Sequence, residues 1–124
     1  MFRRLSFNQM VKRTQDRREN ELDAVFHALA DRTRRAILKS LAEGERTVSE
    51  LAEPFSMSLA AVSKHLKVLE EVGLLKRSID GRIHRCTMDA APLRDASELI
   101  GEYAAFWGDQ LGRLEQFFKE EKAK

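Results

Sequence analysis

The stretch TVSELAEPFSMSLAAVSKHLKVLEEVGLLKRSIDGR, residues 47–82, contains the local signals that decide the fold. TVSE at 47–50 has the spacing of a capping box, in which the threonine and glutamate side chains each bond a free backbone N–H at a helix start. A longer helix is predicted from its capping residue Ser58 to Gly73. Its apolar residues recur at spacings of three and four, so we expect one buried stripe: Leu59, Val62, Leu66, Leu69 and Val72.

Beyond Gly73 the apolar pattern changes from that of a helix to that of strands. The segments LLKRSI and RIHRCTM lie on either side of Asp80-Gly81, a dipeptide typical of tight hairpin turns. The sequence therefore predicts a β-hairpin with its turn at Asp80-Gly81.

Helices are also predicted on both sides of this stretch. ELDAVFHALA at 21–30 has apolar residues at helical spacing, and a second helix is expected from the capping residue Asp31 to Gly44. Pro92 opens a last helix that we expect to run to about residue 120. Two helices joined by EPFSM and followed by a hairpin predict a mainly α fold with a two-stranded β-wing, a winged helix-turn-helix.

The composition limits the classes of protein. The 124 residues suit one domain, which we place at 20–124 after a basic N-terminal tail at 1–19 that is unpacked or a poorly packed helix. Charged residues make up 34% of the chain, so we expect no membrane span, and one cysteine excludes an internal disulfide framework. We find no secretory segment, Gly-rich phosphate loop or Ser-His-Asp arrangement. We therefore expect a cytoplasmic protein that is not an enzyme and uses no cofactor.

The middle of the chain is basic and favours a nucleic-acid partner. Residues 58–88 carry six basic and three acidic side chains, as expected of a phosphate-binding face. In a helix-turn-helix the second helix enters the major groove of double-stranded DNA, where small side chains allow close approach and lysines reach phosphates. His65 is expected to bond a phosphate or to support the turn. The candidate DNA-binding residues are Ser58, Ala60, Ala61, Ser63, Lys64, His65 and Lys67 on the helix, and Arg77 and Arg82 on the hairpin.

Three segments together carry a family resemblance: FHALADRTRRAILKSL, the stretch at 47–82, and the aromatic last helix. They resemble the ArsR/SmtB family of winged helix-turn-helix repressors over residues 21–120. The resemblance implies binding to an operator, often that of the protein's own operon. It also implies a homodimer, and twofold symmetry then predicts a palindromic operator with half-sites about 34 Å apart.

The resemblance places the first and last helices at the dimer interface. The last helix carries apolar residues on more than one stripe of its surface. A helix that packs on its own domain and faces solvent on its other side needs only one apolar stripe. We therefore expect it to pack on its own domain and on a second copy of the chain, although its aromatic group also suits a pocket for an apolar ligand. No small-molecule effector is identified by the sequence. The candidate interface residues are Leu22, Val25, Phe26, Tyr103, Phe106, Trp107, Leu111, Leu114 and Phe118.

The sequence departs from the metal-sensing members of that family. Some of those members carry paired cysteines in the segment that corresponds to residues 47–52, and this chain has no cysteine there. Others carry His and carboxylate metal ligands along the last helix, and the last helix of this chain contains no His and no Cys. We expect no metal site, with His84 and Cys86 on one strand face as the remaining candidates. Two alternatives stay open: a metal- or redox-responsive repressor of the same fold, and a protein-interaction winged helix that no longer binds DNA.

Overall fold

The computed structural model describes residues 6–123, which form five helices and a three-stranded antiparallel sheet. The chain divides between Leu93 and Arg94 into two compact units. The first unit holds α1–α4, the sheet and Leu93, the first residue of α5, and the rest of α5 belongs to the second. Within the described residues no helix is both long and apolar enough to cross a membrane.

Helix α1 (Phe7–Leu29) is longer than the predicted helix at 21–30. It begins with a capping box in which the Ser6 hydroxyl accepts from the backbone N–H of Gln9 and the Gln9 side chain accepts from Ser6 N–H. Residues 7–19 of the predicted tail are therefore helical, and all of them are exposed, while residues 1–5 lie outside the described residues. Only Val25 and Ala28 of α1 are buried, in the turns nearest α2.

Helix α2 (Arg32–Ala42) begins at the predicted cap, with Asp31 Oδ1 accepting from Arg34 N–H at 3.0 Å. Gly44 follows the helix with a φ of 145°, a conformation that side-chain-bearing residues rarely adopt. The chain then forms β1 (Arg46–Thr47), which pairs antiparallel with β3 in the strand order β1-β3-β2. The sheet therefore has three strands instead of the predicted two, because a two-residue strand is too short to show a period of two in the sequence.

The helix-turn-helix unit follows, with α3 (Val48–Ala52) and α4 (Leu59–Glu71) in contact. The capping box at Thr47 and the Ser58 cap are both present as predicted. Val62, Leu66 and Leu69 are fully buried in the core with residues of α2 and the sheet. The prediction for Leu59 was wrong: this side chain is 58% exposed, because α4 begins outside the core.

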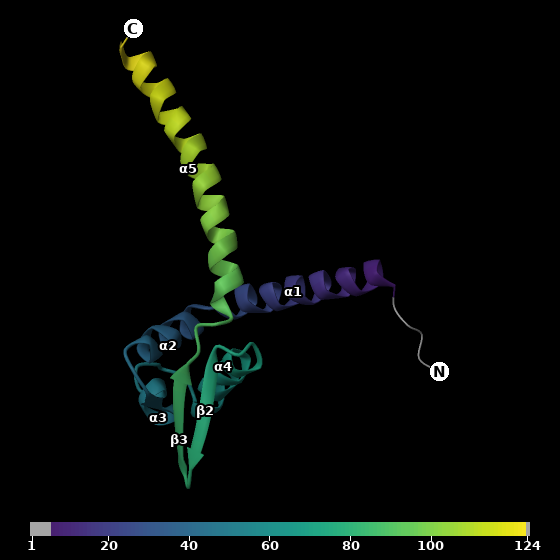
Figure 1. Cartoon of the computed structure of the whole chain (residues 1–124). Coiled ribbons are helices and arrows are strands. Elements are labelled where there is room, and N and C mark those ends of the chain that lie inside the picture. Colours follow the sequence, from purple (N-terminus) through teal and green to yellow (C-terminus); the bar gives the residue numbers. More distant parts are fainter. Residues whose placement is uncertain (1–5, 124) are drawn as a thin grey trace. The chain divides into compact units, whose positions relative to one another are not determined.

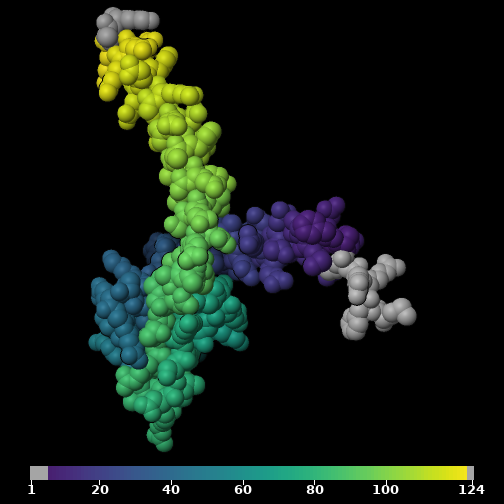
Figure 2. Space-filling model, in the orientation of Figure 1, coloured from purple at the N-terminus to yellow at the C-terminus, as the bar shows by residue number. Residues whose placement is uncertain are grey.

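Strands β2 (Leu75–Asp80) and β3 (Ile83–Met88) run side by side and end in a projecting turn (Figure 1), which tapers to a narrow tip in Figure 2. Asp80 pairs with Ile83, so the two turn residues are Gly81 and Arg82 rather than the predicted Asp80-Gly81. Gly81 has a φ of 63° and Arg82 has a negative φ, a combination that suits a type II′ turn with glycine first.

Helix α5 (Leu93–Ala123) begins with Leu93 packed against the core of the first unit. From Ile100 on, the large apolar side chains of α5 are about half exposed or more, including Trp107 at 58% and Leu114 at 49%. Two aromatic pairs, Phe106–Trp107 and Phe117–Phe118, make edge-to-face contacts along the helix.

We predict that Asp31 stabilises the fold more strongly when it is ionised than when it is protonated. The hydrogen bond from the Arg34 backbone N–H is the main reason why the pKa of Asp31 is below its ordinary value of 3.8. Its stabilisation is therefore complete above the unfolded pKa and is lost as pH falls through the lower, folded pKa. At neutral pH, Asp31→Ala should cost about 1 kcal/mol of unfolding free energy in urea titrations, and Asp31→Asn much less.

The pH dependence separates this cap from a general effect of acid. Below about pH 4 the difference between wild type and Asp31→Ala should shrink, because the protonated carboxyl is a weaker cap. The Asp31→Asn cap does not titrate and should keep its advantage over Asp31→Ala at every pH. A wild-type advantage that stays constant down to pH 2 would contradict the assignment.

Candidate nucleic-acid interface

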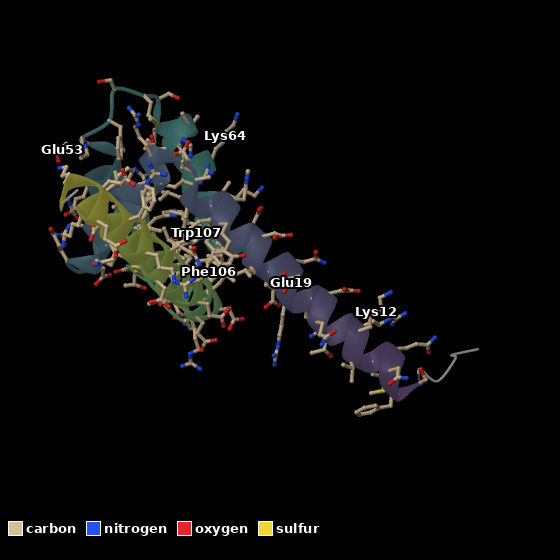
Figure 3. The ribbon with its side chains drawn as sticks, turned by 90° about the horizontal axis from the view of Figure 1, so that it is seen from above. Lys12, Glu19, Glu53, Lys64, Phe106 and Trp107 are labelled. Carbon is tan, nitrogen blue, oxygen red and sulfur yellow. The ribbon has the colours of Figure 1, made fainter. Side chains whose placement is uncertain are left out.

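The first turns of α4 place small side chains and lysines toward solvent. Ser58, Ala60, Lys64 and Lys67 are exposed, while Ala61 and Ser63 are half-buried. Lys64 extends away from the ribbon in Figure 3. The buried residues of α4 lie on the opposite face, so this arrangement follows from the helical period alone.

The Ser58 hydroxyl has a structural role at the start of α4. It accepts from the Ala61 backbone N–H at 3.1 Å and so occupies one of its lone pairs. Its own O–H is still able to donate to an acceptor outside the helix. The same residue can therefore cap α4 and contact a ligand at the N-terminal end.

His65 is directed to the start of α2 rather than to the solvent face of α4. Its Nδ1 lies 3.2 Å from Nη1 of the buried Arg34 and 3.8 Å from Asp31 Oδ1. Arg34 also donates to the backbone oxygens of Ala28 at 2.7 Å and His27 at 2.9 Å. Of the two roles expected for His65, these contacts favour support of the helix-turn-helix over direct contact with a phosphate.

Arg77 and Arg82 of the hairpin have different surroundings. The Arg77 side chain is 20% exposed and forms an ion pair with Glu70 of α4 at 2.5 Å, while its Nη1 lies 3.3 Å from His84 Nδ1. Arg77 therefore ties the hairpin to α4, and its charge is largely matched by Glu70. Arg82 is exposed in the turn, and Arg85 is exposed on β3.

A groove of about 400 Å³ lies between the helix-turn-helix unit and the hairpin. The hairpin side supplies four basic side chains to it, those of Arg77, Arg82, His84 and Arg85, and the helices supply Thr47, Ser49, Leu59 and Ser63 among others. Arg85 and Leu59 were missing from the predicted site. The charge of Arg85 was visible in the sequence, but the position of Leu59 on the groove depends on how deeply α4 enters the core.

The potential metal ligands are dispersed or buried. Cys86 of β3 is fully buried in the core, and burial raises the pKa of its thiol. Among residues 6–123 no group of three or more His, Cys, Asp or Glu side chains is placed to hold a metal ion. His84 Nδ1 faces Arg77 rather than a second ligand.

The predicted interface residues differ in exposure. On α1, Val25 is 3% exposed within the single chain, so it is already buried, while Leu22 and Phe26 are half-buried. The candidates on α5 are all about half exposed or more, and Figure 3 labels two of them. They are Tyr103, Phe106, Trp107, Leu111, Leu114 and Phe118.

Comparison with known proteins agrees with this geometry. A family model described as a helix-turn-helix domain matches residues 29–78. The crystal structure of an ArsR family transcriptional regulator is similar to this chain, with 38% identity, a TM-score of 0.68, and coverage of 73% of this chain and 93% of that one. The chain belongs to the ArsR family of transcriptional regulators.

Two relatives of this ArsR-family chain are named regulators. The HTH-type transcriptional regulator Rv2034 of Mycobacterium tuberculosis is 51% identical over 53 residues, which cover 43% of this chain and half of that protein. The transcriptional repressor SdpR of Bacillus subtilis is 31% identical over 75 residues, covering 60% of this chain and 83% of SdpR. The family membership confirms a transcriptional regulator with a winged helix-turn-helix.

We predict that Arg82 contributes one phosphate contact that does not depend on DNA sequence. Arg82→Ala should weaken binding to every duplex and lower the slope of log affinity against log salt by about one unit, measured by fluorescence anisotropy. Arg113→Ala, an exposed change on α5, is the matched control and should leave the slope unchanged. An unchanged slope for Arg82→Ala would contradict the contact.

We predict that Cys86 does not react in the native protein. Because the thiol is buried and its pKa is raised, little thiolate forms at neutral pH. A chromogenic disulfide reagent should modify Cys86 only at the rate of unfolding, and readily in denaturant. Rapid native modification with loss of DNA binding would instead support the redox-responsive alternative.

Proposed function

We propose that this protein is a homodimeric repressor that binds a palindromic operator, and that one such operator precedes its own gene. The observation that carries the proposal is the exposed first turn of α4, with its small side chains and Lys64, beside a groove bordered by Arg82 and Arg85. Small side chains suit close approach to base edges, and flanking cations suit the two phosphate backbones. The name of its relative SdpR, a transcriptional repressor, supports repression.

The proposed contacts divide by chemistry. Lys64, Lys67, Arg82 and Arg85 neutralise phosphates and give affinity that falls with salt. Ser58, Ala60, Ala61 and Ser63 face base edges and contribute to sequence preference. Arg77 and His65 act indirectly, because Arg77 Nη2 already bonds Glu70 and His65 Nδ1 already faces Arg34 Nη1.

The aromatic face of α5 supports the homodimer. Ile100, Tyr103, Trp107, Leu111, Leu114 and Phe118 follow one another at spacings of three and four, and each is exposed by 49% or more. Apolar patches of this extent on a single chain are typical of protein interfaces. A second copy offers the same stripe, and twofold pairing buries both.

We further propose that operator binding requires no bound metal. The support is the donor set: the sequence of α5 contains neither His nor Cys, and the single cysteine is buried. Transition-metal sites need several thiolate or imidazole donors that converge on one point.

Footprinting on the DNA immediately upstream of the protein's own reading frame tests the proposed function. We expect two protected half-sites related by a dyad, about one helical turn apart, with the same protection in the presence of a chelator. Lys64→Ala/Lys67→Ala should lose protection but keep its helical content. If selection from a random-sequence pool recovers no duplex, the proposal is wrong and the protein-interaction alternative is favoured.

We predict that a charge on the α5 stripe separates the dimer. Leu111→Asp should shift the sedimentation mass from that of a dimer toward that of a monomer. It should also weaken operator binding at least tenfold, because each monomer then binds one half-site without the help of its partner. Gln116→Asp adds the same charge on the opposite face of α5 and should remain dimeric. A dimeric Leu111→Asp protein would exclude this stripe as the interface.

A further inference from the structure

Leu59 is an apolar side chain that the core does not use. It is the first residue of α4 and is 58% exposed, whereas Val62 and Leu66, at the next positions of the same stripe, are fully buried. Because more than half of its side chain is exposed, Leu59 contributes less to the core than these neighbours do. Its position in the first turn of the recognition helix makes it available for a contact outside the chain.

The surroundings of Leu59 limit what that contact is. Leu59 lines the groove beside Ser63 of α4, and Ile83 of β3, which is 46% exposed, adds a second apolar side chain. Arg82 and Arg85 border the same groove. The site thus combines an apolar surface with positively charged side chains beside it. This combination suits a partner that presents apolar groups between two rows of negative charge.

DNA offers one such group to a helix in the major groove. Among the edges of the four bases, only thymine presents a methyl group there, and aliphatic side chains contact it favourably. A leucine cannot bond the donors and acceptors of the other base edges. Side chains at a helix start lean toward the N-terminus, so Leu59 extends from the end of α4 that is expected to lie nearest the bases.

We propose that Leu59 determines operator specificity by packing against thymine 5-methyl groups. This inference rests on the proposed function and adds a base preference to it. Each half-site should contain a T·A pair where the first turn of α4 enters the groove. Ala60, exposed on the same turn, borders this contact.

The test compares two proteins on two duplexes. The duplex recovered by selection from a random-sequence pool is made with thymine and with deoxyuridine in the half-sites, which removes only the methyl groups. Wild type should bind the uracil duplex about fourfold more weakly for each methyl contacted. Leu59→Ala should bind both duplexes with nearly equal affinity, close to that of wild type on the uracil duplex.

Two control variants isolate the contribution of Leu59. Leu59→Met keeps an aliphatic side chain of similar volume and should retain most of the preference for thymine. Met10→Ala shortens a side chain of α1 that is 54% exposed and should leave the ratio of the two affinities unchanged. Because Leu59 and Met10 are both more than half exposed, all three variants should melt close to the wild-type temperature.

The possible results separate the inference from the proposed function. Equal wild-type binding to both duplexes overturns the inference and leaves a DNA-binding repressor. A uracil penalty that persists in Leu59→Ala also overturns it, and assigns methyl recognition to another side chain such as Ala60. If wild type binds no duplex, the proposed function itself fails.

Discussion

Val62, Leu66 and Leu69 of α4 are fully buried, and their burial fixes the rotation of α4 about its own axis. Once this stripe faces the core, the period of 3.6 residues places Ala60, Lys64 and Lys67 toward solvent. The same rotation brings Glu70 to the hairpin, where it pairs with Arg77. The solvent face of α4 and the attachment of the wing thus depend on one packing interaction.

Arg34 supports that arrangement from the other side of α4. Its buried guanidinium donates to two carbonyl oxygens at the end of α1, and Asp31 accepts from its backbone N–H. Arginine has no acceptor, so in the 3.2 Å contact between the two side chains Arg34 Nη1 donates and His65 Nδ1 accepts. The start of α2, the end of α1 and the middle of α4 are therefore held by one side chain, and loss of Arg34 would leave several polar groups unpaired.

Local signals made much of this fold predictable. The caps at Asp31, Thr47 and Ser58 each need only neighbouring residues, and all three were found from the sequence. The box formed by Ser6 and Gln9 has the same signature, but the polar residues after it hid the helix. Periodicity gives the angle of a side chain around a helix and not its depth along the axis, so Leu59 was wrongly placed in the core. The contacts of Arg34 with His65 and of Arg77 with Glu70 join distant segments, and no local pattern predicts them.

The account depends on the N-terminal end of α4 entering the major groove, with Val62, Leu66 and Leu69 turned away from the DNA. Protection of guanine N7 from methylation by dimethyl sulfate tests this directly, because N7 lies on the major-groove edge. We expect the bound protein to protect N7 in two patches about one helical turn apart, and Lys64→Ala/Lys67→Ala to lose that protection. The account would be contradicted if the bound protein protected the sugar-phosphate backbone from cleavage but left every guanine N7 reactive.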